Sequence, residues 1–202
     1  MDKNIMAGEL ERLYEKFSAH TLPRWEDLPE IDLYMDQVIA LMRKYLSIFE
    51  EDGEKMLTPA MVNNYVKMGA VPPPVKKKYS KAHIAHLLII CFLKQILPIS
   101  MICEIIRTYL GVYSESEMLN AFSSEYEQIL RAAVASSKKE AARILEMQED
   151  AAYIRSVLTM KAAAYAGAQC AIAQNLFSLR EDGEGEPARV RGRERSREAK
   201  ER

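Results

Sequence analysis

Glycine, proline and cysteine are scarce in this chain, with 8, 8 and 3 residues among 202. Glycine and proline interrupt helices, so their scarcity, together with many Ala, Leu, Met, Glu and Lys residues, favours an all-α, mainly helical fold. The three cysteines are far apart and lie among apolar residues, which argues against a disulfide framework and against a zinc-ligand spacing. We expect Cys91, Cys103 and Cys170 to be small buried hydrophobic residues in a reducing compartment.

A secretory leader and a long apolar run are also lacking. The N-terminal residues MDKNIMAGELERLYEKF have no apolar core of the kind found in signal peptides. The longest strongly apolar run, Leu87 to Leu93, is far shorter than the roughly 20 residues that cross a bilayer. We therefore expect a cytoplasmic protein that has no membrane partner.

Motifs of catalysis are not found either. The sequence has no Gly-rich phosphate loop, no nucleophile elbow, no catalytic Cys/His pair and no cluster of metal ligands. His83 and His86 lie three residues apart, but no further residue with ligand spacing accompanies them, so packing or surface roles are favoured over a metal site. We predict a protein that is not an enzyme and that uses no cofactor and no metal.

Positive charge is confined to two stretches of an otherwise acidic chain. Residues 57–111 contain 7 basic and 1 acidic side chains, a net charge of +6, and residues 187–202 contain 7 and 3, a net charge of +4. Residues 1–56 and 112–186 carry net charges of −6 and −5, so the whole chain has a net charge of −1. A basic island in an acidic protein is an electrostatic footprint of nucleic-acid binding.

The island contains the stretch LTPAMVNNYVKMGAVPPPVKKKYSK, which starts at Leu57. Thr58 followed by Pro59 predicts the start of a short helix, and Gly69 predicts its end. A helix of barely three turns is not stable alone, so its apolar side must dock on neighbouring elements. That side consists of Met61, Val62, Tyr65 and Met68.

The polar side of this short helix carries Asn63, Asn64 and Lys67 and no carboxylate. An asparagine amide can pair with adenine through two hydrogen bonds, and a lysine can contact guanine or phosphate. This side is therefore able to face a DNA groove. The alternative is an ordinary solvated helix surface.

Three prolines and three lysines follow the short helix. Pro72 to Pro74 favour an extended backbone, and Lys76, Lys77 and Lys78 come next, with Tyr79 directly behind them. Lysines that neutralise phosphates release condensed counterions, so this position favours a short basic wing that holds DNA phosphates. In that interpretation Tyr79 joins the lysines; the alternative is a solvated run of charge.

Helical periodicity continues on both sides of the basic stretch. Before it, we predict a helix over residues 8–18 and another that Asp32 caps and that runs to about Phe49. After it, Ser80 caps an apolar helix over residues 81–97, and Ser100 caps one that ends near Gly111.

This order of elements is similar to that of MerR-type winged helix-turn-helix regulators. The runs IDLYMDQV, LTPAMVNNYVKMGAVPPPVKKKYSKAHI and LKQILPIS more closely resemble the bacterial family catalogued as domain of unknown function 1836, over about residues 22–112. The resemblance implies a MerR-like domain and a role in transcription. Asn63 and Asn64 stand where MerR recognition helices carry an arginine and a tyrosine, and the wing is shorter, so the base preference of MerR proteins is not carried over.

Residues 123–179 are rich in Ala, Glu, Lys and Leu and have no proline. We predict two long helices with a break near residues 148–150. The second has apolar residues at helical spacing, namely Ile154, Leu158, Tyr165, Ile172, Leu176 and Leu179. The MerR resemblance implies that these helices form a dimer; the alternative is packing against the first half of the chain. A small-molecule effector pocket lined by Tyr153, Tyr165, Met147 and Met160 is a further alternative to plain core, and no sequence feature supports it.

The predicted organisation has four regions. They are an N-terminal helix and irregular connection (1–30), a MerR-like helix-turn-helix domain (31–112), a helical dimerisation or effector region (113–180) and a disordered basic tail (181–202). The predicted function is that of a DNA-binding transcriptional regulator that acts as a homodimer. The residues predicted to bind double-stranded DNA are Asn63, Asn64, Lys67, Lys76, Lys77, Lys78 and Tyr79. The alternative function is a helical protein–protein interaction module that keeps the helix-turn-helix shape without binding DNA.

Overall fold

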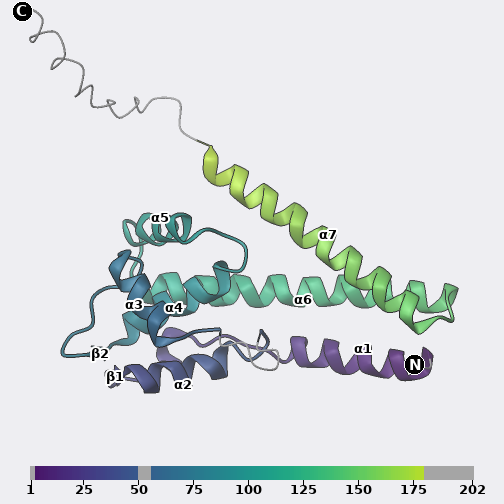
Figure 1. The fold of residues 1–202 in the computed structure, drawn as a ribbon, viewed down its shortest axis with the longest axis horizontal. Coiled ribbons are helices and arrows are strands. Elements are labelled where there is room, and N and C mark those ends of the chain that lie inside the picture. Colours follow the sequence, from purple (N-terminus) through teal and green to yellow (C-terminus); the bar gives the residue numbers. More distant parts are fainter. Residues whose placement is uncertain (1–2, 50–55, 180–202) are drawn as a thin grey trace, which may run out of the picture.

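The computed structural model describes residues 3–49 and 56–179, which form helices and one very small sheet (Figure 1). In chain order the elements are α1 (Lys3–Ser18), the 3₁₀ helix η1 (Trp25–Asp27), β1 (Leu33–Tyr34), α2 (Met35–Tyr45), α3 (Pro59–Lys67), β2 (Lys78–Tyr79), α4 (Lys81–Leu93), α5 (Ile99–Leu110), α6 (Glu115–Met147) and α7 (Ala151–Ser178). The expected mainly helical fold is confirmed. The predicted tail at 181–202 lies outside the described residues. Within the two described ranges, no helix combines the length and the apolar character that crossing a membrane requires.

Helix α4 forms the centre of the largest hydrophobic core. All ten residues from His83 to Phe92 are buried, so the helix is covered on every side. The buried side chains around it come from four other helices: Val38 and Met42 from α2, Val62 and Tyr65 from α3, Ile102 and Ile106 from α5, and Met118 and Leu119 from α6. The start of α6 thus belongs to the same core as α2 to α5.

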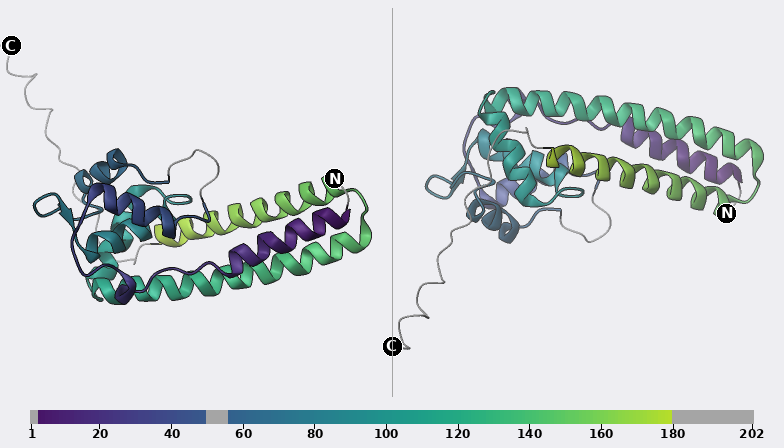
Figure 2. Two further views of the ribbon diagram at one scale, coloured as in Figure 1. Left: turned by 90° about the horizontal axis from the view of Figure 1, so that it is seen from below. Right: turned by 90° about the horizontal axis from the view of Figure 1, so that it is seen from above.

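The C-terminal half of α6 leaves this core, and α1 and α7 run alongside it (Figure 2). Two small hydrophobic clusters join the three helices; one consists of Met6, Ile144, Ala151 and Ile154, and the other of Tyr14, Val134 and Ala141. The hydroxyl groups of Tyr14 and Ser137 lie 2.9 Å apart. Hydrogen bonds from Arg143 and from Lys161 of α7 lower the pKa of Glu140 to about 2.

The connection between α1 and α2 is fixed to α6 by polar contacts. The buried Glu127 carboxylate accepts hydrogen bonds from the Leu22 amide at 3.0 Å and from the Arg24 guanidinium at 3.0 Å. The Trp25 amide donates to Asn120 Oδ1 at 2.8 Å, and Ser123 Oγ donates to the carbonyl of Pro23. An irregular segment with two prolines is therefore held in one position relative to the core.

Helices α1, α2 and α5 start elsewhere than the sequence predicts, and α1 begins at Lys3 and not at residue 8. Helix α2 begins at Met35 and not after Asp32, because β1 pairs with β2 in antiparallel fashion and draws residues 33–34 into extended backbone. Helix α5 begins at Ile99 with Pro98 at its N-cap, so Ser100 is not the cap.

Helices α4 and α6 also differ from the predicted ranges. Helix α4 ends at Leu93, four residues earlier than expected, and a turn covers the remainder. Helix α6 starts at Glu115, well before residue 123, because Ser114 and Glu117 form a capping box in which each accepts the backbone N–H of the other. The predicted break near residues 148–150 is confirmed, and Asp150 caps α7.

Candidate nucleic-acid interface

Helix α3 starts where the sequence predicts. Thr58 Oγ1 accepts the backbone N–H of Met61 at 3.2 Å, and Pro59 occupies the first helical position, where a missing N–H costs nothing. Val62 and Tyr65 are buried against the core, so the short helix is fixed by its apolar side. Burial raises the pKa of Tyr65 to about 12, with a smaller contribution from Cys91, and this phenol stays neutral.

The end of α3 is equally well defined. Gly69 has a φ of +72°, the left-handed region that suits glycine, and its N–H donates to the carbonyl of Val66. The Ala70 N–H donates to the carbonyl of Tyr65, which completes a Schellman motif whose apolar contact joins these two buried residues. The chain therefore leaves α3 in a fixed direction, toward the wing.

The outward side of α3 carries the three residues predicted for base contact. Asn63, Asn64 and Lys67 are all exposed on one short helix. Asn64 Nδ2 lies 3.5 Å from Met68 Sδ, a weak contact that does not involve the amide oxygen. The structure thus brings two amides and one ammonium together on a surface without a carboxylate.

The wing is a tight turn that projects lysines. The backbone groups of Val75 and Lys78 exchange two hydrogen bonds of 3.1 and 2.9 Å, which leaves Lys76 and Lys77 at the tip. Both tip residues have positive φ, 51° and 64°, as in a type I′ turn, where Asn and Gly are usual. Left-handed backbone costs a residue with a side chain about 1–2 kcal/mol. Lys76 and Lys77 therefore occupy positions where their backbone conformation lowers the stability of the turn.

Lys78 and Tyr79 form strand β2, and their side chains differ in exposure. Lys78 Nζ lies 5.2 Å from the ring centroid of Tyr34, its partner in β1, so its ammonium remains at the surface. Tyr79 is only 3% exposed and packs edge-on against the ring of His83 at 5.5 Å. The side chain of Tyr79 therefore belongs to the core and not to the lysine-bearing surface, contrary to its predicted place among the DNA-binding residues.

Two histidines of α4 fix the loop between α3 and the wing. His83 Nδ1 accepts the backbone N–H of Ser80 at 3.0 Å, and its Nε2 lies 3.3 Å from the Pro73 carbonyl. His86 Nδ1 lies 3.2 Å from the carbonyl of Ala70. Burial lowers the pKa of His86, so this ring is neutral at pH 7 and its Nδ1–H donates to the carbonyl. Sequence reasoning gave no hint of the contacts with the two carbonyl groups, which join residues 10 and 16 positions apart.

Lysines of the candidate interface have no acidic partners among the described residues. In the ranges that the structure covers, no ion pair involves Lys67, Lys76, Lys77 or Lys78. Elsewhere, Lys3, Lys81, Lys138 and Lys161 each pair with a glutamate. In the described residues, no paired carboxylate therefore offsets the ammonium groups of α3 and the wing.

A second unusual surface lies on α7. The residues Tyr165, Ile172, Leu176 and Leu179, which we call the α7 stripe, share one side of the helix and are each more than half exposed. Residues 162–179 contain no charged side chain. The same side of α7 begins at the buried Ile154, so an apolar row continues beyond the point where α1 and α6 cover it.

The residues proposed for an effector pocket do not enclose one. Tyr153, Tyr165, Met147 and Met160 are each more than half exposed. The other side of α7 contacts the turn after α4, where Cys170 Sγ and Gln174 Nε2 lie 3.3 and 3.4 Å from the carbonyl of Ile96.

Of the cysteines, Cys91 is buried, and Cys103 and Cys170 are half-buried.

Comparison with known proteins gives a family match. The family model described as "Domain of unknown function (DUF1836)" matches residues 23–131, more than half of the chain. No curated protein and no solved structure matches. The matched range runs from η1 into α6, and it includes α3, the wing and the α4 core but neither α1 nor α7.

Proposed function

We propose that the chain, which belongs to the DUF1836 family, is a DNA-binding transcriptional regulator that acts as a homodimer through a MerR-like winged helix-turn-helix. The observation that carries the proposal is a pair of features at one end of the molecule. A helix side with two asparagines, one lysine and no carboxylate lies there together with a strained turn that presents lysines. Lysines held in left-handed backbone indicate that their charge is used for binding.

In this proposal the two features have different tasks. Helix α3 enters the major groove, where Asn63 and Asn64 pair with adenine edges and Lys67 contacts guanine or phosphate. Lys76, Lys77 and Lys78 hold flanking phosphates and so set the register of the helix in the groove. The buried Val62 and Tyr65 keep α3 fixed on the core while its other side meets DNA.

The homodimer uses the α7 stripe. An uncharged, apolar helix side of this length is rarely left in contact with water and marks a protein contact surface. The second copy is the occupant that needs no further assumption, because a twofold axis brings two identical apolar rows together. The dimer then reads two half-sites about one helical turn apart, roughly 34–36 Å.

A salt titration with the purified full chain tests the DNA-binding half of the proposal. Each phosphate contact contributes about 0.9 to the slope of log K against log salt, so K76A/K77A/K78A lowers the slope by roughly 2.7. The control K16A/K139A removes two exposed lysines of α1 and α6 and leaves the slope unchanged. The proposal fails if the native chain binds no promoter fragment at low salt, or if the triple variant keeps the native slope.

The sequence preference is tested separately. In genomic footprinting of the tagged protein, N63A/N64A shifts or abolishes the protected sites, whereas the salt dependence of nonspecific binding stays as in the native chain. Unchanged footprints would remove the two asparagines from the reading surface.

A second candidate function, a protein-interaction module, is favoured by one observation, namely the uncharged surface of α7. In that case the chain binds another protein and not DNA. Recovery of a stable complex from nuclease-treated extract, together with no affinity for DNA at low salt, would support it over the regulator.

A further inference from the structure

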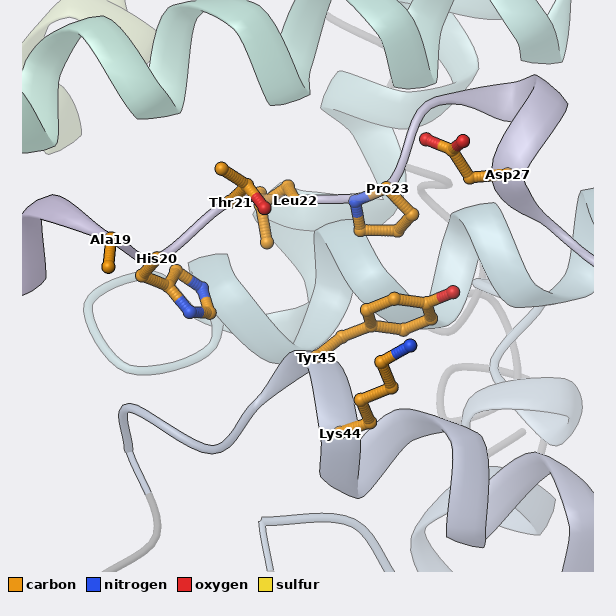
Figure 3. A pocket seen from close by; sticks show the side chains of 8 residues that line it. All are labelled: Ala19, His20, Thr21, Leu22, Pro23, Asp27, Lys44 and Tyr45. Carbon is orange, nitrogen blue, oxygen red and sulfur yellow. The ribbon is translucent and has the colours of Figure 1, made fainter. Parts of the chain in front are cut away.

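A cavity of about 530 Å³ lies between the connection that follows α1 and the C-terminal end of α2 (Figure 3). His20, Thr21 and Pro23 line it from the connection, Asp27 from η1, and Lys44 and Tyr45 from α2; the remaining lining residues are Ala19 and Leu22. This volume lies within the range of about 300–1,000 Å³ that small-ligand sites occupy. The cavity is at the opposite end of α2 from the wing.

Two opposite charges face this cavity without pairing with each other. Lys44 Nζ lies 5.9 Å from the ring centroid of Tyr45, and no ion pair involves it among the described residues. Asp27 Oδ2 accepts the backbone N–H of Arg24 at 2.8 Å, and the other carboxylate oxygen has no hydrogen-bond partner among the described residues. An ammonium and a carboxylate are thus held apart in one hollow.

The remaining polar groups of the cavity are neutral. Burial lowers the pKa of His20, and its Nε2 is buried without a hydrogen-bond partner in the described part of the chain. Burial, and then the nearby charge of Asp27, raise the pKa of Tyr45, whose hydroxyl therefore stays protonated. A buried polar atom that lacks a partner is costly, and a bound molecule can satisfy it.

We infer that this cavity binds a small zwitterion of the amino-acid class. Lys44 holds its carboxylate, Asp27 holds its ammonium group, and the ring of Tyr45 with Pro23 provides an apolar surface for its side chain. A ligand with a single charge leaves the opposite protein charge unmatched, and this mismatch gives the site its selectivity.

The position of the cavity connects it to the candidate DNA interface. Helix α2 begins directly after β1, whose Tyr34 pairs with Lys78 of the wing, and ends at Lys44 and Tyr45 in the cavity. A ligand that fixes the end of α2 therefore acts on the helix that is continuous with β1, the strand that pairs with the wing. This regulatory step rests on the proposed function, whereas ligand binding itself does not.

Fluorescence of Trp25, the one tryptophan of the chain, measures binding without DNA. This residue lies in η1, the same short helix as Asp27 of the cavity. Glycine and the L-amino acids other than tryptophan, which is itself fluorescent, are titrated separately, with propionate and ethanolamine as probes of single charge. We expect at least one amino acid to bind and both single-charge probes to bind at least tenfold more weakly. We expect K44M and D27N each to weaken binding at least tenfold, since each removes one charged contact.

Matched controls remove the same charges elsewhere. K139M and E146Q change exposed residues of α6 and leave the affinity as in the native chain. Circular dichroism verifies that K44M and D27N are folded. The variant K44R keeps the positive charge and is expected to retain binding, so it tests the role of the charge even if D27N does not fold.

Three results would overturn the inference: no amino acid bound at millimolar concentration, propionate or ethanolamine bound as tightly as any amino acid, or native affinity in both K44M and K44M/D27N. A DNA titration of the native chain with and without the bound amino acid then tests the regulatory step. If the chain binds no DNA at all, the proposed function fails while the fluorescence result still decides the ligand site.

Discussion

Helices α3 and α7 are each covered on one side only, but their uncovered sides differ in kind. Helix α3 has nine residues, buries Val62 and Tyr65, and exposes asparagines and a lysine. Helix α7 has 28 residues, buries only Ala151 and Ile154, and exposes alanines and the α7 stripe. Water satisfies exposed amides and ammonium groups, so the surface of α3 is stable in solution and available to nucleic acid. The α7 stripe is apolar and its contact with water is unfavourable, which is the basis of its proposed role in the dimer.

The largest effect on the molecule is expected from substitutions that make the α7 stripe charged, so that its surface becomes polar like that of α3. In I172E/L176E, two apolar side chains of the stripe, each worth about 2 kcal/mol when buried, become charged. The proposed homodimer joins two stripes and so contains four of these side chains, and its dissociation constant rises by more than 1,000-fold, since every 1.4 kcal/mol is a factor of ten. Analytical ultracentrifugation measures this change, and circular dichroism shows unchanged helicity because both residues are exposed in the single chain.

A control for charge comes from the opposite side of the same helix. S156E/T159E adds two glutamates at exposed positions about half a turn away from the stripe and leaves the dimer intact. A native chain that is monomeric at all concentrations, or a stripe variant as dimeric as the native chain, would contradict the assignment of this surface.

The next largest effect is expected from substitutions at the tip of the wing. They are expected to raise the free energy of unfolding and to weaken DNA binding. In K76N/K77G, the tip residues become those that a type I′ turn favours, so the free energy of unfolding rises by about 1–2 kcal/mol. Two fewer phosphate contacts lower the salt slope of DNA binding by about 1.8. Urea unfolding and the salt titration measure the two changes. A variant that gains stability and keeps native DNA binding would show that the strained lysines serve no DNA contact.

Acidification affects the two helices differently. Burial lowers the pKa of His86 below its ordinary value of 6.5, so the unfolded state binds more protons as the pH falls below that value. Stability is therefore fully present above pH 6.5 and declines with acidification, by up to about 1.4 kcal/mol per pH unit for this one group. No histidine lies in α7. The loss of stability that His86 causes on acidification therefore affects the core that supports α3 and the wing.

The substitution H86Q tests this assignment. It removes the titrating ring, and the pH dependence of the free energy of unfolding between pH 5 and 7 becomes shallower than in the native chain. His20, whose pKa burial also lowers, maintains a residual slope that H20Q/H86Q removes. An unchanged slope in H86Q would show that the ring binds as many protons in the folded state as in the unfolded state.

Local signals allowed parts of this architecture to be predicted from the sequence. Thr58, Pro59 and Gly69 act on their own backbone neighbours, so both ends of α3 were predictable, and so was the break before Asp150. The same kind of signal, a serine with a glutamate three residues on, marks the start of α6 at Ser114, and the sequence prediction missed it.

Contacts between distant residues were not predictable from periodicity. The pairing of residues 33–34 with 78–79 moved the start of α2 away from Asp32. Tyr79 packs against the ring of His83 in the core, although the position of Tyr79 beside three lysines in the sequence suggested an exposed side chain. The cavity beside Tyr45 exists because Glu127 of α6 holds a connection about 100 residues earlier in the chain, and no pattern in one segment encodes that distance.

The smallest effect compares one methyl group at two glycines, one at the end of α3 and one inside α7. At both Gly69 and Gly167, an added Cβ meets no atom within 4 Å, so packing does not distinguish the two sites. Backbone conformation does: Gly69 has a φ of +72°, whereas Gly167 is helical. G69A is therefore expected to lower the free energy of unfolding by about 1 kcal/mol, and G167A to raise it by about 0.5–1 kcal/mol. Urea unfolding of both variants measures the difference, and a shift of the same sign in both would mean that the left-handed turn after α3 is not what directs the chain toward the wing.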